Sequence, residues 1–185
     1  MRKAATERLT ASAARLFQER GLTRVGINEI IRDADVARMS LYNNFRSKED
    51  LALAAYVEVS KSRHEAIAAA VDVSAGPAEA VLAIFDLAAK LAAESSFRGC
   101  VFINLAAHLG VDDERLAGLV RKHKLALREC FERLASNLGD PEPAVLGRQL
   151  LALWDGALVD AFIEGDAASI LAARAAAARL IARDV

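Results

Sequence analysis

The sequence GINEIIRDADVARMSLYNNFRSKED, residues 26–50, predicts two short helices, a tight turn between them, and the start of a third helix. In the first helix the apolar residues recur three and four positions apart, which places them on one face. They are Ile27, Ile30, Ile31 and Ala34. In the next segment Leu41 and Phe45 lie about one turn apart and point into the same small core. Only residues 34–36 separate the two helices, and so short a connection is typical of a helix-turn-helix.

The second short helix carries polar side chains on the side away from this core. We expect Arg38 and Asn43 to bond to base edges, and Ser40 and Tyr42 to donate hydrogen bonds to phosphate oxygens. Lys48, at the start of the third helix, adds a positive charge beside backbone amides that suit a phosphate. The predicted DNA-binding residues are Arg38, Met39, Ser40, Tyr42, Asn43 and Lys48.

Motifs along about the first fifty-five residues carry a resemblance to a known family. They are Leu16-Phe17, Glu19-Arg20-Gly21, Ile27 to Ile31, Val36, Ser40-Leu41-Tyr42, Phe45, Ser47-Lys48-Glu49 and Leu51. Together they resemble the DNA-binding domain of the TetR family of bacterial transcriptional regulators. Three positions depart from the family pattern: Gly26 replaces a capping Ser or Thr, Asp35 replaces the turn Gly, and Asn44 replaces an aromatic residue or His. Asp is tolerated in the turn because it enters left-handed conformations more readily than most residues.

Composition limits the class of protein. With 185 residues, 54% of them hydrophobic, the chain is large enough to bury a sizeable core. No apolar run approaches the ~20 residues that cross a bilayer, and the N-terminus does not resemble a signal peptide, so we expect a cytoplasmic protein without membrane contact. The two cysteines match no disulfide framework or metal motif. We therefore expect no metal and no cofactor.

Net charge is unevenly distributed along the chain. Residues 1–50 contain ten Lys and Arg against seven Asp and Glu, a net charge of +3, and the remaining residues carry −4. The basic share coincides with the predicted DNA-binding domain, although an imbalance of this size is by itself weak evidence for a nucleic-acid partner.

The rest of the chain is predicted to be almost entirely helical, so the fold class is all-α, with about nine helices. Ser47, with Asp50 three residues later, is typical of a capping box and predicts a long helix to about Val71. The segment Cys100–Leu109 is apolar nearly all round, which predicts a helix buried against several neighbours. We expect a helix-turn-helix domain at residues 1–50, with the start of the connecting helix, and a second helical domain at residues 51–185.

The last two predicted helices have enough apolar surface for two partners. From Val145 to Ile163 the apolar residues cover roughly half the circumference, more than the ~100° stripe of a helix buried on one side. The final helix is rich in Ala, which lets another helix approach closely, and a two-fold operator needs two copies of the motif. In the TetR family the last two helices of each subunit form a four-helix dimer interface. The resemblance places there Leu150, Leu153, Ala157, Ala161, Ala173, Ala177 and Leu180. Packing of the last helix on its own subunit is the alternative.

The resemblance implies a regulator with a separate ligand-binding and dimerisation domain. Such a protein is a homodimeric repressor that binds a palindromic operator on double-stranded DNA and is released by a small, largely apolar effector. The ligand must favour one arrangement of the connecting helices by about 1 to 3 kcal/mol or more. Pocket candidates are large or polar residues on otherwise buried helices: Phe85, Cys100, Phe102, Asn104, His108, His123, Phe131, Trp154 and Asp155. Each has the alternative of being ordinary core, above all His123 within its apolar stripe.

Three other functions remain open from the sequence. Cys100 follows Gly99 at the start of a predicted helix, whose positive end lowers a thiol's pKa, and with Arg98 as the neighbouring cation it could sense electrophiles or oxidants. A DNA-binding protein without a ligand is the second alternative. An all-helical carrier or enzyme without DNA binding is the third, but the sequence has no nucleophile and base pair, metal-ligand spacing or Gly-rich phosphate loop. We therefore do not expect an enzyme.

Overall fold

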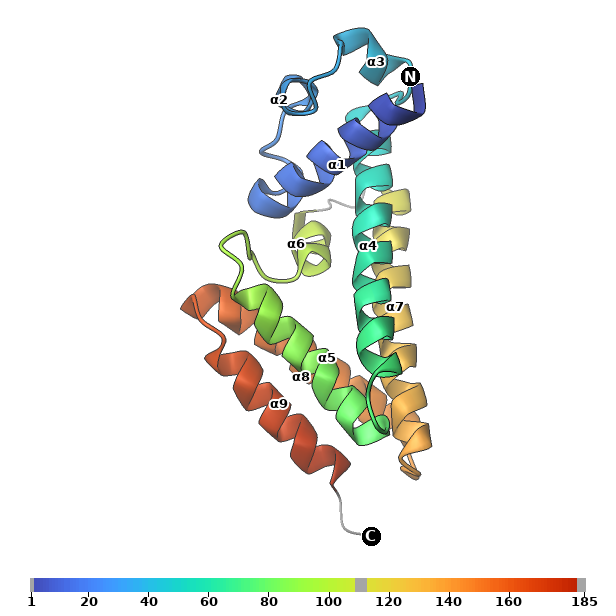
Figure 1. Ribbon diagram of the computed structural model, residues 1–185, viewed down its shortest axis with the longest axis vertical. Coiled ribbons are helices and arrows are strands. Elements are labelled where there is room, and N and C mark those ends of the chain that lie inside the picture. The colour runs from blue at the N-terminus through green and yellow to red at the C-terminus, as the bar shows by residue number, and fades with distance from the viewer. Residues whose placement is uncertain (1, 109–112, 183–185) are drawn as a thin grey trace. The chain divides into compact units, whose positions relative to one another are not determined.

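The structure, a computed structural model, describes residues 2–108 and 113–182, without the side chains of residues 2, 3 and 108. Within these ranges the chain is all-helical and has nine helices, which confirms the predicted fold class (Figure 1). The helices are α1 (Arg2–Arg20), α2 (Ile27–Asp33), α3 (Arg38–Tyr42), α4 (Lys48–Asp72), α5 (Pro77–Ala92), α6 (Val101–His108), α7 (Glu114–Asn137), α8 (Pro143–Glu164) and α9 (Ala168–Ile181). Among the described helices, none is both long enough and apolar enough to cross a membrane.

The helices pack into two compact units. Unit 1 comprises residues 1–62 and 101–121, and unit 2 comprises residues 63–100 and 122–185. The long helices α4 and α7 each contribute residues to both units, because their ranges cross these boundaries. An independently folding domain that ends at residue 50 stays a prediction.

Unit 1 is built around an apolar stripe of α1. Its buried residues Leu9, Ala13 and Phe17 recur about every four positions and therefore lie on one face of the helix. The Phe17 ring stacks on Tyr56 of α4 with 5.9 Å between ring centroids, and Tyr56 also meets Phe102 of α6. Burial raises the pKa of the Tyr56 hydroxyl well above its usual value. These contacts make one core from α1, the first half of α4, and α6.

The turn between α2 and α3 has the backbone shape that the sequence predicts. Asp35 has φ 47°, and it is the one non-glycine residue with positive φ in the described part of the chain. At the start of α2, Gly26 occupies the N-cap in an extended conformation, without a side-chain cap. At the start of α4, the Asp50 amide donates to the Ser47 hydroxyl at 3.2 Å, so Ser47 caps this helix as predicted.

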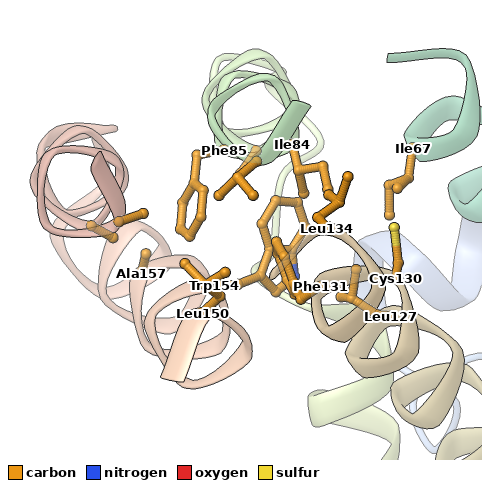
Figure 2. Packing of buried hydrophobic residues seen from close by; sticks show 14 of the residues in the cluster. Ile67, Ile84, Phe85, Leu127, Cys130, Phe131, Leu134, Leu150, Trp154 and Ala157 are labelled. Carbon is orange, nitrogen blue, oxygen red and sulfur yellow. The ribbon is translucent and has the colours of Figure 1, made fainter. Parts of the chain in front are cut away.

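Unit 2 has a core of interlocking aromatic and aliphatic side chains from α5, α7 and α8 (Figure 2). Phe85 of α5 lies 6.2 Å from the Phe131 ring and 6.0 Å from the Trp154 ring, centroid to centroid. Gly147 lets α8 approach α7 closely, since a Cβ at this position would lie 2.8 Å from the Glu132 backbone nitrogen. Close backbone approach of this kind is what a glycine inside a helix permits.

The segment predicted as a helix buried on all sides differs from that prediction. α6 begins at Val101, one residue later than expected, and Cys100 precedes it. Phe102 and Leu105 are buried, whereas Ala106 and Ala107 are exposed. The prediction was wrong because small alanines read as apolar in the sequence pattern although they cost little when they face water.

Candidate nucleic-acid interface

The recognition helix α3 turns two apolar residues inward and its remaining long side chains outward. Leu41 is fully buried and Phe45, just beyond the helix, is 8% exposed. Met39 is 65% exposed and Tyr42 is 47% exposed. Arg38 and Asn43 are exposed as well, and Ser40 and Lys48 are half-buried. The predicted DNA-facing residues thus lie outside the core, on or next to one short helix.

The predicted contacts Arg38 and Tyr42 are themselves paired. The Arg38 guanidinium lies over the Tyr42 ring, 5.8 Å from its centroid, one helical turn apart. Arginine stacked on an aromatic face loses some of its freedom to rotate before it meets a ligand. The i, i+4 spacing of Arg38 and Tyr42 in the sequence allows this contact, because residues four apart are neighbours on a helix surface.

Helix α1 is tied to the helix-turn-helix by ion pairs that neutralise its own basic side chains. The pairs join Arg8 to Asp35 at 2.9 Å, Arg15 to Asp33, and Arg20 to Glu29. A hydrogen bond from the Ser12 hydroxyl lowers the pKa of the Asp33 carboxyl most, and a hydrogen bond from the Arg15 guanidinium lowers it further. In the described part of the chain, Arg38 and Lys48 form no ion pair. Arg38 on the recognition helix and Lys48 at the start of α4 are therefore positive side chains available to a phosphate backbone.

An open groove of about 660 Å³ runs between the first turns of α1 and the recognition helix. It is lined by Ala4, Ala5, Arg8, Asp35, Val36, Ala37, Ser40, Asn43 and Asn44. Two predicted DNA-binding residues, Ser40 and Asn43, therefore face this groove.

The start of α4 is held from a distant part of the chain. The Arg115 guanidinium donates to the Asp50 carboxylate at 2.6 Å, across sixty-five positions. This bond lowers the pKa of Asp50. Asp50 was predicted only as part of a capping box, and its partner could not be read from the sequence because the two positions are so far apart. Lys48 lies in the same turn, and its burial lowers its pKa while Glu49 acts in the opposite sense.

The helices α1 to α3, with a five-residue α3, an exposed polar face and basic side chains beside it, are typical of a helix-turn-helix DNA-binding protein. Residues 9–55 match the profile of a family described as bacterial regulatory proteins, tetR family. This match assigns the N-terminal part of the chain to the TetR family of transcriptional regulators. Such regulators are DNA-binding transcription factors and not enzymes.

Solved structures of known regulators share the fold over nearly the whole chain. A TetR-family transcriptional regulator from Streptomyces coelicolor is 27% identical with a TM-score of 0.89, covering 97% of this chain and 91% of the other. A TetR transcriptional regulator from Chloroflexus aurantiacus is 26% identical with a TM-score of 0.87, covering 100% and 98%. The regulatory protein TetR from Rhodobacter sphaeroides, at 22% identity and a TM-score of 0.85 over 95% and 98%, shares the fold. No curated protein matches the sequence.

The residues predicted to line a ligand pocket fall into both units. Phe85, Phe131 and Trp154 come together in unit 2, where they pack against one another in the core. Phe102 is buried in unit 1 against Tyr56, and Asn104 is half-buried on the same helix. The His108 side chain lies outside the described residues.

Polar candidates in unit 2 have partners of their own. His123 is 6% exposed and stacks on His64, with 4.6 Å between ring centroids. Asp155 forms an ion pair with Lys124. Cys100 is half-buried, and the neighbouring Arg98 guanidinium donates to the backbone carbonyls of Ser95 and Phe97.

The predicted dimer residues mostly face their own protomer. Leu150, Ala157, Ala161, Ala173 and Ala177 are buried in the core of unit 2, and Leu153 and Leu180 are half-buried against it. The five buried side chains are thus already covered within one copy of the chain. The surface that α8 and α9 leave open contains other residues, among them Val145, Ala152, Gly156, Ile163, Leu171, Ala172 and Ala175.

The buried His123 predicts a pH-dependent stability. The pKa of His123 is lowered to about 3, mainly by burial and to a smaller extent by the nearby groups His64, Lys124 and Arg63. The unfolded chain takes up a proton near pH ~6.5 while the folded chain does not, so stability falls as the pH drops below this value. We expect His123→Phe, which keeps a ring beside His64, to remove about 2 kcal/mol of the loss between pH 7 and pH 5.

Chemical denaturation of the wild type and His123→Phe at the two pH values measures this difference. Equal losses of stability in the two proteins would show that His123 is not the group that titrates. Wild type and His123→Phe at pH 7 provide the internal reference, because wild-type His123 is mostly neutral in both the folded and the unfolded state there.

Proposed function

We propose that the protein is a cytoplasmic homodimeric repressor, which binds a palindromic operator through α3 and releases it when a small, largely apolar molecule binds unit 2. The observation that carries the DNA-binding part is the exposed face of α3, where Arg38, Tyr42 and Asn43 project beside Lys48. Bacterial regulators of this family act where the chromosome is, which supports the cytoplasmic location.

The side chains of α3 suit different parts of a DNA duplex. Arg38 and Asn43 carry donors that can read base edges in the major groove. The Tyr42 hydroxyl, Ser40 and Lys48 suit phosphate oxygens, which fix register without reading sequence. In this docking Tyr42 also supports the Arg38 guanidinium from below, which favours one direction for its fork of donors.

Arg38→Ala and Lys48→Ala should therefore have different effects. We expect Arg38→Ala to cost about 1 to 3 kcal/mol on a duplex that the wild-type protein selects from a random library, with little change on unrelated duplexes. We expect Lys48→Ala to weaken binding to both kinds of duplex alike. It should also reduce the slope of log affinity against log salt concentration by about one. Mobility-shift titrations at several salt concentrations measure both effects.

Tyr42→Phe is the matched variant, since it keeps the ring under Arg38 and removes only the hydroxyl. It should weaken all duplexes slightly and leave the preference among them intact. If Arg38→Ala and Tyr42→Phe both left operator affinity unchanged, α3 would not dock in the proposed way.

A second copy of the chain fits the open surface of α8 and α9. Ile163 is 72% exposed and Leu171 is 56% exposed, and small residues of the same two helices, Gly156 of α8 and Ala172 and Ala175 of α9, are exposed as well. Exposed apolar side chains beside small residues suit close helix packing. The proposed interface therefore consists of residues different from most of those that the sequence predicted there.

We expect the free protein to be a dimer at micromolar concentration, and Leu171→Glu to shift it towards monomer because the new charge would be desolvated at the interface. Val73→Glu is the control, since Val73 is 85% exposed outside α8 and α9. Sedimentation of the three proteins measures the effect. A monomeric wild type, or a fully dimeric Leu171→Glu variant, would contradict the proposed interface.

The ligand part of the proposal rests on the apolar composition of unit 2. Its core is formed almost entirely by aliphatic and aromatic side chains, and among the polar groups of unit 2 the His64 and His123 rings stack on one another and Lys124 forms an ion pair with Asp155. An apolar ligand can enter such a region without breaking these pairs, whereas a strongly polar one would have to replace them.

The fluorescence of the single tryptophan, Trp154, can report the binding of a ligand to unit 2. We expect compounds that release the selected duplex to change Trp154 emission, because this ring lies in the core of unit 2. Screening apolar compounds for both signals tests the prediction. Release of DNA that is never accompanied by an emission change would place the effector elsewhere.

A further inference from the structure

The Asn44 side chain donates a hydrogen bond in place of a backbone hydrogen bond that is missing at the end of the recognition helix. In a regular α-helix the Ser40 carbonyl would accept from the backbone amide of residue 44. Here that amide donates to the Leu41 carbonyl at 2.9 Å, and the Asn44 side-chain Nδ2 donates to the Ser40 carbonyl at 2.6 Å. The side chain therefore satisfies an acceptor in the last turn of α3.

The same amide group also reaches α1. Its Oδ1 accepts a hydrogen bond from the Thr6 hydroxyl at 3.0 Å, across thirty-eight positions of the chain. Asn44 and Thr6 are both half-buried. One side chain thus bridges the backbone of the recognition helix and the first turns of α1, which lie beside α3 in Figure 1.

This bridge has a counterpart before the recognition helix. Arg8, two positions after Thr6, pairs with Asp35 in the turn that precedes α3. Helix α1 therefore holds α3 by polar contacts on both sides of its short sequence. Leu41, the one buried residue within α3, fixes its distance from the core but leaves rotation about that anchor to be restrained by these outer contacts.

We propose that Asn44 is a positioning residue for DNA reading, which acts through the Ser40 carbonyl and the Thr6 hydroxyl to fix the orientation of the last turn of α3. The inference rests on the proposed docking of α3 in the major groove. Tyr42 and Asn43 lie in this turn, so a loosened Asn44 changes where their donors point. Base readout depends on these directions, whereas attraction to phosphates depends mainly on charge.

Thr6→Val is the decisive variant, because it removes the hydroxyl at nearly constant side-chain shape and is distant in sequence from α3. The probes are a duplex selected from a random library by the wild-type protein and an unrelated duplex of equal length. We expect Thr6→Val to weaken binding to the selected duplex about threefold to tenfold, as for the loss of one hydrogen bond, and to leave the unrelated duplex unaffected. Thr6→Ser should restore the preference.

Asn44→Ala completes a double-mutant cycle. If the two side chains act through one another, Thr6→Val should have no further effect on the selected duplex in the Asn44→Ala background. Ser12→Ala is the stability control, since it removes a hydroxyl of the same helix that contacts Asp33 of α2 at 2.5 Å. We expect it to lower the melting temperature without changing the ratio of the two affinities.

The outcomes separate the possible roles. If Asn44 instead touched a phosphate directly, Asn44→Ala would weaken both duplexes alike and Thr6→Val would change neither, which would overturn the proposal. Equal effects of Ser12→Ala and Thr6→Val on the affinity ratio would also overturn it, by assigning the effect to general destabilisation. Failure to select any duplex with the wild type would reject the proposed function itself.

Discussion

The recognition helix is five residues long, and a helix of this length cannot hold its own shape in water. Its conformation is therefore imposed by the surrounding chain. Burial of Leu41 and Phe45 fixes the side of α3 that faces the core. The left-handed backbone of Asp35 sets the angle at which the chain enters α3. Every exposed donor on α3 depends on these anchors, because none of the donors can keep its direction if the helix unwinds.

Charge in unit 1 serves two separate purposes. The overall isoelectric point of about 6.3 suggests no preference for nucleic acid. In the structure, Arg8, Arg15 and Arg20 are matched with carboxylates of α2 and its turn, so they attach α1 to the helix-turn-helix. Exposed pairs of this kind contribute little stability each, but several along one helix restrict its rotation. Arg38 and Lys48, which form no ion pair among the described residues, remain for a partner.

The sequence predicted those features that local pattern determines. The helix-turn-helix, the cap at Ser47 and the unusual turn at Asp35 depend on spacing or on the intrinsic preferences of one residue, and the structure confirms them. The partners of Asn44 and Asp50 could not be predicted, since they lie thirty-eight and sixty-five positions away. A side chain's identity limits what it can bond to, but only the folded chain decides which distant group it meets.

Helix α8 shows a second limit of pattern. Its apolar residues extend around so much of the circumference that the sequence predicted two partners without showing which side meets which. The structure assigns Leu150, Ala157 and Ala161 to the protomer's own core, through contacts with α5 and α9. The inward side includes the large Leu150 and Trp154, whereas the outward side has exposed small residues such as Ala152 and Gly156 beside the exposed Ile163. Because small side chains permit close backbone approach, the outward side suits another helix better than it suits water, which is the physical argument for a second copy of the chain there.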